Sequence, residues 1–309
     1  MKRDNSNNVS VIIPTYNRCK ILYKVLIALE RQTVDKYRSE ILVIDDGSTD
    51  NTASMVKDFL INSKLNIRYF FQENKKQGAA RNLGIEHAEM PIIIFIGDDT
   101  VPDPNFIESH LTFHKNLEEP NESCVIGYTT WHKDIKVTPF MQYIGEFGHQ
   151  FGYSLIDGVG PLRFNFYYTS NLLIPSSVLS KQDYFFDEDF DVYGWEDIEL
   201  GYRIENSGAK LFFNRDAIAY HYHPVTVSSF CRRQENVGKA SNIFIKKHPE
   251  LEWFLGDKAV LENNAKPYLK AVIYKNIANL LDNLFSFPLS HDLYRFILDT
   301  YYAKAATNN

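Results

Sequence analysis

Short apolar runs alternate with amphipathic stretches over the first hundred residues of the chain. Apolar runs bounded by polar or turn-forming residues predict four strands, at residues 9–13, 40–44, 67–71 and 92–96. Between them, apolar side chains recur at helical spacing and predict three helices. The first begins near Ile21, the second is capped by Thr49 or Asp50 and ends near Leu60, and the third covers residues 78–88. This alternation predicts an α/β fold with a Rossmann-like, mostly parallel central sheet and helices on both faces.

The pattern becomes irregular and rich in aromatic residues from about Ser123. Residues 140–168 mix Phe, Tyr and Gly with few charges, which is typical either of a mobile substrate loop or of packing in an α+β half. Later runs predict a helix over residues 197–207 and strands at residues 171–174, 210–213 and 217–220.

The chain after Pro224 is predicted to be helical. Seven apolar residues form an amphipathic stripe, namely Leu269, Val272, Ile273, Ile277, Leu280, Leu281 and Leu284. Pro288 ends this stretch, and Ser290 can cap a last helix through Tyr302. Because such a stripe usually meets the core of its own chain, we expect it to dock on the preceding domain and to add a surface for a homo-oligomer. Peripheral membrane association is the alternative, although only two lysines lie among the stripe, fewer than interfacial helices usually carry.

The size of the chain allows one large α/β domain with an appendage or two modest domains. It has 309 residues, of which 44% are hydrophobic, so a sizeable core can form. The patterns predict one domain over residues 1–230, with halves at about 9–100 and 101–230, and a helical extension over residues 231–309. The formal net charge of −6, without a long run of Lys or Arg, argues against a nucleic-acid partner.

Cysteine usage and the first residues bear on the compartment in which the protein works. The cysteines, Cys19, Cys124 and Cys231, are far apart and lack CxxC spacing, which suits a reducing compartment and neither a zinc site nor a disulfide framework. Residues 1–8 are polar and lack the apolar stretch of a signal peptide. Apolar runs long enough to span a membrane, about 18 residues, do not occur. We therefore expect a cytoplasmic protein, either free or peripheral at the inner face of the membrane.

Polar clusters follow three of the predicted strands, at residues 14–18, 45–50 and 98–99. Ligands of open α/β sheets bind at the carboxyl ends of the parallel strands. We therefore expect the three clusters to meet at one edge of the sheet and to form a binding site there.

Two of these clusters contain adjacent carboxylates. Asp98 and Asp99 close a strand of five apolar residues, where two carboxylates repel each other and lose hydration; a hard divalent cation offsets both costs. The alternative is a polar turn whose Asp caps the next segment. Asp45 and Asp46 end a neighbouring strand, where a carboxylate can accept hydrogen bonds from a ribose or a base edge, or can form a turn with Gly47.

Two helix starts combine residue types that suit a binding site. Residues 77–82 begin a helix whose N-terminus attracts anions, and Arg81 there faces either a ligand or a nearby Asp. Trp195, Glu196 and Asp197 begin another helix, where they resemble a general base beside a sugar-stacking aromatic. The alternative is a helix first turn in which the dipole favours acidic side chains.

His221 and His223 follow a predicted strand. Residues two apart on a strand point to the same face, so both imidazoles can reach one ligand, and imidazole is a common metal ligand. A structural role is the alternative for each of them.

The string Val11-Ile12-Ile13-Pro14-Thr15-Tyr16-Asn17-Arg18 resembles the opening of the family 2 inverting glycosyltransferases. Further elements follow in the family's order, at residues 45–50, 78–82, 98–99, 194–197 and His221. Each is a weak signal alone, but five in this order are specific, and the resemblance covers roughly residues 9–225. It implies a GT-A fold, a nucleotide-sugar donor and a Mn²⁺ or Mg²⁺ ion.

The resemblance also implies roles for residues that would hold the nucleotide. The backbone around Pro14 and Thr15 would line the base pocket. Asp46 would contact the nucleoside, with Asp45 beside it, and Arg81 would contact the nucleotide or hold its loop.

At the reaction centre the resemblance implies Asp99 as the main metal ligand and Asp98 as a contact to the ribose or the donor sugar. Asp197 would be the general base, Glu196 a contact to acceptor or donor, and His221 a further metal ligand. The nearby His223 leaves the histidine assignment open between the two. Many family members carry a third acidic residue where this chain has Gly97, so one donor contact is missing while the metal site is intact.

These expectations combine into one leading function. The protein would transfer a sugar from a nucleotide-diphosphate sugar, with UDP favoured by family frequency, to a hydroxyl of a glycan, lipid-linked or protein acceptor. A nucleotide-dependent oxidoreductase is disfavoured because the first strand is not followed by a glycine-rich fingerprint. The alternative from another class is a catalytically silent nucleotide- or sugar-binding protein on the same fold.

Overall fold

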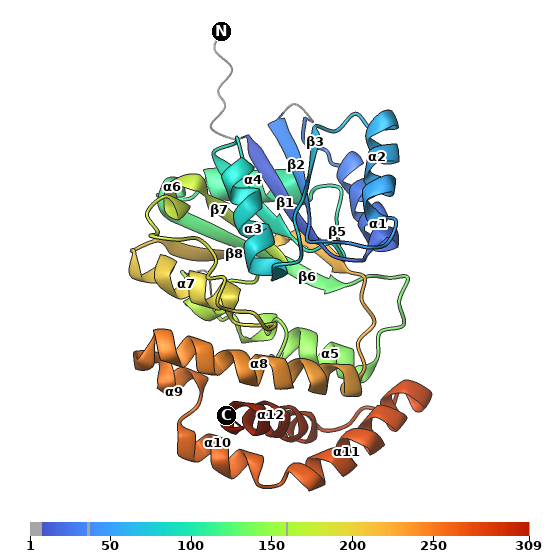
Figure 1. Ribbon diagram of the computed structural model, residues 1–309, viewed down its shortest axis with the longest axis vertical. Helices are drawn as coiled ribbons and strands as arrows, with labels where there is room; N and C mark the ends of the chain where they lie inside the picture. The colour runs from blue at the N-terminus through green and yellow to red at the C-terminus, as the bar shows by residue number, and fades with distance from the viewer. Residues whose placement is uncertain (1–7, 36–37, 159, 309) are drawn as a thin grey trace. The chain divides into compact units, whose positions relative to one another are not determined.

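The computed structural model describes residues 8–35, 38–158 and 160–308 (Figure 1). The polar segment noted above at residues 1–8 lies outside this description, apart from Asn8. The chain forms two compact units: the first comprises the chain up to Ile135 with Ile156–Glu188 and Asp197–His223, and the second comprises Lys136–Leu155, Asp189–Glu196 and Pro224–Asn309. The second unit thus includes two segments from before residue 230, where the sequence pattern predicts the domain boundary; that boundary stays a prediction.

The first unit is built on an eight-stranded sheet with the order β3-β2-β1-β4-β7-β6-β8-β5. Its first half is parallel and confirms the four strands predicted from the apolar runs. These strands are β1 (Val9–Thr15), β2 (Ser39–Asp45), β3 (Ile67–Phe71) and β4 (Ile92–Ile96). Since β1 lies between β2 and β4, the carboxyl ends of these three strands are neighbours.

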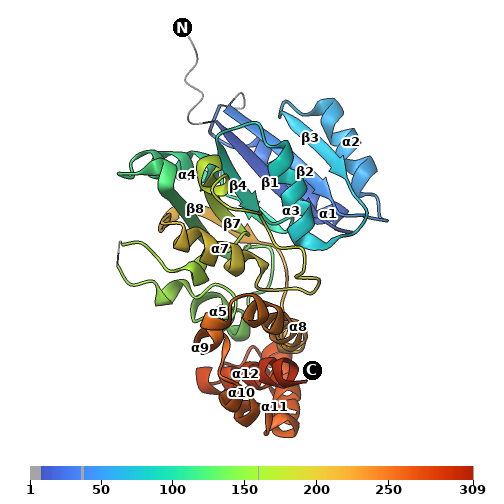
Figure 2. The same cartoon turned by 60° about the vertical axis from the view of Figure 1, so that its left-hand side comes forward.

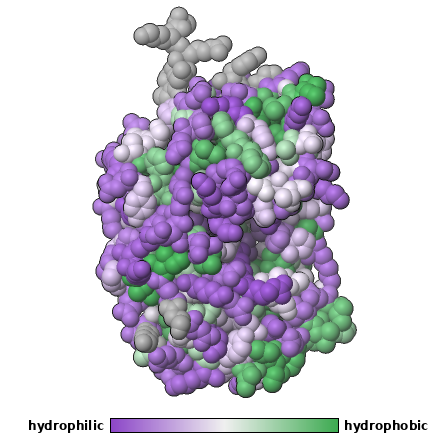
Figure 3. Space-filling model, viewed as in Figure 1, coloured by the Kyte–Doolittle hydropathy of each residue, from purple (hydrophilic) through white to green (hydrophobic). Residues whose placement is uncertain are grey.

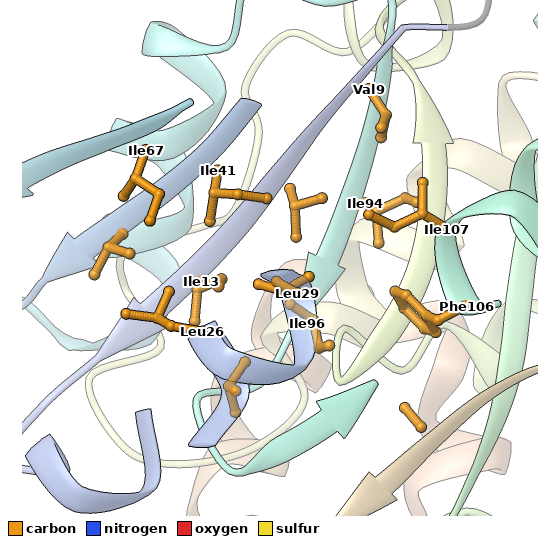
Figure 4. Close-up of a cluster of buried hydrophobic side chains, with 14 of the residues drawn as sticks. Val9, Ile13, Leu26, Leu29, Ile41, Ile67, Ile94, Ile96, Phe106 and Ile107 are labelled. Carbon is orange, nitrogen blue, oxygen red and sulfur yellow. The ribbon is translucent and has the colours of Figure 1, made fainter. Parts of the chain in front are cut away.

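Helices cover both faces of the parallel strands, as predicted. On one face, α1 (Cys19–Glu30), α2 (Thr52–Asn62) and α4 (Phe106–Lys115) enclose a core with alternate residues of the strands (Figure 4). On the other face, α3 (Lys76–His87) approaches β1 so closely that a Cβ at Gly84 would lie 2.5 Å from a methyl carbon of Ile12. A side chain at this glycine would push α3 away from the sheet.

The cap predicted for α2 is wrong in detail. Its N-cap is Asn51, which makes no side-chain capping bond. The carboxylate of Asp50 nevertheless accepts the N–H of Thr52 at 3.0 Å, so it satisfies a donor of the first turn from one position further out.

The second half of the sheet is mixed and differs in part from the sequence-based expectation. It contains β5 (Thr100–Pro102), β6 (Ser123–Trp131), β7 (Asn171–Pro175) and β8 (Lys210–His221). Of these, β7 confirms its predicted strand, whereas β6 lies where the sequence was interpreted as irregular.

The two strands predicted at residues 210–213 and 217–220 form the single strand β8. Its pairing with β6 jumps from Asn214 to Ile218 while the partner advances by one residue, from Gly127 to Tyr128. The polar interruption in the sequence is therefore a bulge within one strand.

The second unit is helical. It comprises α5 (Pro139–Glu146), α8 (Val227–Lys247), α9 (Glu252–Leu255), α10 (Lys258–Ala265), α11 (Tyr268–Leu280), the π-helical segment η6 (Leu281–Phe285) and α12 (His291–Thr307) (Figure 2). Helices α8 and α12 pack so closely that a Cβ at Gly238 would lie 2.3 Å from the carbonyl oxygen of Tyr302. Ser290 caps α12 through the N–H of Leu293, as predicted.

Two expectations for this unit are corrected. Residues 140–168 are not a loop throughout, because α5 covers their start. They also do not belong to a single α+β half, because residues up to Leu155 belong to the second unit and those from Ile156 to the first. The apolar stripe does not meet the core of its own chain, since five of its seven residues are exposed: Leu269, Ile273, Ile277, Leu280 and Leu284. Among the described residues, no helix has the length and apolar character needed to cross a bilayer.

Candidate active site

The carboxyl ends of β1, β2 and β4 bring the three polar clusters together, as predicted. The backbone N–H of Asp46, after β2, donates to the carbonyl of Thr15, at the end of β1, at 2.9 Å. The hydroxyl of Thr15 in turn donates to a carboxylate oxygen of Asp98, after β4, at 2.8 Å. A continuous chain of hydrogen bonds therefore links the ends of the three strands, and Pro14 lies within β1 directly before it.

Arg18, just after β1, contacts both members of the carboxylate pair. Its guanidinium makes a short contact with Asp99, and its Nε lies 3.8 Å from Asp98. The two carboxylates are largely buried, with 12% and 15% of their side chains exposed. Sequence reasoning assigned no role to Arg18, although it is the basic residue of a polar cluster at a strand end.

His221 reaches Asp99 through strand pairing. Thr100 of β5 pairs with His221 of β8, and the N–H of Tyr222 donates to the carbonyl of Asp99 at 2.7 Å. This pairing places Nε2 of His221 3.4 Å from Oδ1 of Asp99. His223 is exposed, with its ring centre 5.8 Å from that of His221, so both histidines are close to this site.

The two adjacent carboxylates differ in their ease of ionisation. Burial, together with the negative charge of Asp99, raises the pKa of Asp98 to about 7. Burial acts on Asp99 in the same direction, but His221 and Arg18 outweigh it and hold the pKa of Asp99 well below its usual range. Arg18 lies beside both carboxylates and favours the ionised form of each.

Asp45 and Asp46 have different surroundings. Asp45 is fully buried, and its carboxylate accepts the N–H of Ser48 at 2.8 Å and the hydroxyl of Tyr69 at 2.6 Å, so it shapes the turn after β2. The carboxylate of Asp46 accepts the N–H groups of Lys75 and Lys76, at 2.8 and 2.9 Å. The anion attracted by the N-terminus of α3 is thus, in this structure, a side chain of the protein itself.

Arg81 lies on α3 and is nearly buried. Its guanidinium carbon is 5.3 Å from the ring centre of Phe186, and the neighbouring Asn82 holds that segment by accepting the N–H of Phe186 and donating to its carbonyl. Arg81 therefore lies against the segment before α7 (Glu196–Asn206). Its predicted contact with a nucleotide stays a prediction.

Asp197 lies in the first turn of α7, close to the residues that precede β7. One carboxylate oxygen accepts the N–H of Ile198 at 2.9 Å, and the other lies 3.5 Å from the N–H of Thr169. Thr169 lies two residues before Asn171, the first residue of β7, and Asn171 pairs with Ile96 at the end of β4. Asp197 is therefore tied to the same edge of the sheet as Asp98 and Asp99.

Trp195 and Glu196 belong to the second unit. The indole N–H of Trp195 donates to the carbonyl of Val237 at 2.9 Å, and its ring lies near those of Phe244 and Phe254. Trp195 has a φ of 73°, which is rare for a non-glycine residue. The side chain is used within its own unit, and Glu196 is buried.

The protein side chains at this site are too few to surround a metal ion by themselves. Within the described residues, no group of three or more His, Cys, Asp or Glu side chains is arranged to hold a metal ion by itself. A surface groove of about 740 Å³ between α1 and α2 includes none of the predicted site residues. Asp98, Asp99 and His221 are thus the predicted site residues that Arg18 and strand pairing bring together.

Comparison with known proteins agrees with this fold. The family model described as "Glycosyl transferase family 2" matches residues 10–180, more than half of the chain. The chain belongs to this family.

Two comparisons give the closeness of the match. Validoxylamine A glucosyltransferase from Streptomyces hygroscopicus subsp. jinggangensis is 28% identical over 292 residues, which cover 82% of this chain and 64% of that protein. Hyaluronan synthase from Pasteurella multocida is 29% identical over 246 residues, covering 70% of this chain and 24% of the synthase. The chain thus spans less than two thirds of the length of these relatives.

A solved structure confirms the GT-A fold. A mannosyltransferase from Pyrobaculum calidifontis, in complex with GDP-Man and Mn²⁺, has a TM-score of 0.61 at 18% identity, covering 95% of this chain and 85% of that one. Because the identity is low, this similarity speaks for the fold alone.

Proposed function

We propose that this protein is an inverting glycosyltransferase, which transfers a sugar from a nucleotide-diphosphate sugar to an acceptor hydroxyl. The observation that carries the proposal is the meeting of Asp98, Asp99 and His221 at one edge of the sheet, with Asp197 tied to that edge through Thr169. A nucleotide- or sugar-binding protein without activity would not require carboxylates both at Asp98 and Asp99 and at Asp197.

The residues around the carboxylate pair fit a divalent cation, Mn²⁺ or Mg²⁺. Carboxylate oxygens and an imidazole nitrogen suit such ions, and Asp99 and His221 bring these two kinds of ligand within 3.4 Å of each other. Asp99 and His221 would hold the ion, with His223 within reach. Two protein ligands suffice where the phosphates of a substrate complete the coordination. Such an ion, when bound, neutralises the negative charge of the departing diphosphate.

The donor would lie along the ends of β1, β2 and β4. Asp46 and the backbone of Pro14 and Thr15 would line the nucleoside pocket, while Asp98 would accept a hydrogen bond from the ribose or donor sugar. A carboxylate of Asp46 that now accepts backbone N–H groups has further lone pairs for a base or ribose. Arg81 would hold the nucleotide loop from α3. UDP is the proposed nucleotide by analogy with family members.

Asp197 would act as the general base. Its carboxylate lies in the first turn of a helix, where the N–H groups of Ile198 and Thr169 hold it in place. The proton of the acceptor hydroxyl would pass to Asp197 as the oxygen attacks the anomeric carbon opposite the nucleotide. Glu196 and Trp195 would contact the acceptor or the donor sugar. The acceptor would be a glycan, a lipid-linked sugar or a glycoprotein.

A donor screen followed by turnover measurements tests the proposal. Thermal shift with UDP-glucose, UDP-GlcNAc and GDP-mannose, each with Mn²⁺ or with EDTA, should identify a stabilising donor. Release of the nucleoside diphosphate should then rise on adding an acceptor, and the product should have the inverted anomeric configuration by NMR. Donor binding without release under any acceptor tested would favour the silent binding protein.

A further inference from the structure

The second unit exposes a continuous row of apolar side chains on α11 and the residues after it. Five of them, Leu269, Ile273, Ile277, Leu280 and Leu284, are between 50% and 81% exposed. Phe285 and Phe287 extend the row, and both are more than half exposed. We call these seven residues the α11 ridge; Figure 3 shows hydrophobic surface over α11 and the segment that follows it, at the lower right.

The opposite face of the helix is already used within the unit. Ala271 and Ala278 are completely buried, and α11 contacts α12 and α8. The carboxylate of Asp282, in η6, is fully buried and accepts the N–H of Phe140 at the start of α5. Since these contacts fix the rotation of α11 about its axis, the ridge cannot turn inward without breaking them.

The ridge is large enough for a specific interface. Seven large apolar side chains, each at least half exposed, present on the order of 700 Å² of surface. Monomers rarely expose more than about 300–600 Å² in their largest apolar patch, whereas a standard interface buries about 800 Å² per partner.

The charges of α11 are turned away from the ridge. The ammonium groups of Lys270 and Lys275 lie over aromatic rings, at 5.4 Å from the ring centre of Tyr274 and 5.7 Å from that of Tyr301. A helix that binds an anionic membrane instead presents lysines beside its apolar face. The ridge therefore favours a neutral, apolar partner.

The polar residues beside the ridge suit a second copy of the same surface. Asn276 and Asn283 are exposed and seven residues apart, and each amide both donates and accepts, so it can pair with its own copy across a twofold axis. Within α11, Ile273, Ile277 and Leu280 follow one another at intervals of four and three residues, the spacing of a coiled-coil seam.

We propose that the α11 ridge is the contact between two copies of this chain. The helices α11 of the two copies pair about a twofold axis, with the apolar row of one packed on that of the other and the asparagines at its edge. This dimer does not depend on the proposed enzymatic activity.

Sedimentation velocity of the full chain between about 1 and 100 µM tests the proposal. The parent should be a dimer at the upper end, and Ile277→Asp should raise the dissociation constant at least about 30-fold, the effect of losing a central interface residue. Val260→Asp is the matched control, because Val260 is a similarly exposed apolar residue on α10 of the same unit. The control should dimerise like the parent, and circular dichroism should show that both variants fold.

A second variant reports proximity directly. With Ile277→Cys, a short bis-maleimide should cross-link two chains at a yield well above that of the parent, whose own cysteines are Cys19, Cys124 and Cys231. A parent that stays monomeric at 100 µM overturns the proposal, as does a dimer unaffected by Ile277→Asp. A monomeric parent that binds phosphatidylcholine–phosphatidylglycerol vesicles through the ridge would overturn it in favour of a membrane contact.

Discussion

The guanidinium of Arg18 contacts the carboxylate of Asp99, which also lies 3.4 Å from Nε2 of His221. One buried carboxylate thus has two nitrogen-bearing neighbours from strands that are not adjacent in the sheet. Arg18 follows the first strand, whereas His221 ends the last one in the chain. The positive charge of Arg18 stands where a metal ion would otherwise balance the carboxylate pair, and this relationship leads to two predictions.

Replacing the proposed metal ligand should abolish both ion binding and turnover. Asp99→Asn removes the negative charge but keeps the shape, so Mn²⁺ binding by calorimetry should be lost and turnover should fall at least about 10³-fold. EDTA should inactivate the parent reversibly. Asp58→Asn, an exposed acid on α2, is the control and should behave like the parent. Full activity of the parent in EDTA would refute the metal assignment.

Removing Arg18 should strengthen metal binding in the absence of donor. Arg18→Gln removes a cation that competes for the same carboxylates, so the affinity for Mn²⁺ alone should rise by about tenfold. Arg31→Gln, a basic residue beyond the end of α1, is the control and should bind Mn²⁺ like the parent. An unchanged affinity in Arg18→Gln would show that the guanidinium does not compete with the ion.

The general-base role of Asp197 predicts a loss of turnover without a loss of donor binding. Asp197→Asn can still accept the N–H of Ile198 but cannot take a proton, so turnover should fall by about 10²-fold or more. The donor dissociation constant, measured by calorimetry, should change by less than about threefold. Asp216→Asn, in the exposed bulge of β8, is the control for the substitution itself. If donor binding collapsed, Asp197 would instead be a donor-site or structural residue.

Buried His110 should make the protein less stable in mild acid. Burial lowers the pKa of His110 to about 4, from about 6.5 in the unfolded chain. Between these values only the unfolded chain takes up the proton, so the free energy of unfolding should fall as the pH drops from 6.5 to 4. The loss should be about 2 kcal/mol at pH 5.

Urea denaturation at pH 7 and pH 5 measures this contribution. Nε2 of His110 lies 2.7 Å from the side-chain amide oxygen Oδ1 of Asn171. Because Nδ2 of the same amide donates to the carbonyl of Ala217, Oδ1 is the acceptor and the histidine is the donor. His110→Gln can keep that donor and should reduce the pH dependence, whereas His291→Gln, at an exposed helix start, should retain it. Equal pH dependence in the parent and His110→Gln would exclude this histidine as the cause.

Local patterns predict much of the catalytic unit. Apolar runs such as residues 9–13 and 92–96 become buried strands because both faces of a parallel sheet are covered. The single polar residue in the first run, Ser10, is buried and donates its hydroxyl to Glu40. The meeting of Thr15, Asp46 and Asp98 then follows from the rule that parallel strands end at one edge. The bulge in β8 escapes prediction because a polar interruption in the sequence fits a turn equally well.

By itself, the sequence determined the first four strands and the helices between them, the acidic edge of the sheet and the existence of an amphipathic C-terminal helix. Only the tertiary structure decided that Arg18 joins Asp99, because that contact depends on chain segments about eighty residues apart. It also decided which face of α11 is covered. Periodicity shows that a helix has an apolar side, but close packing on α12 favours small residues, so Ala271 and Ala278 face inward while the larger apolar residues remain outside.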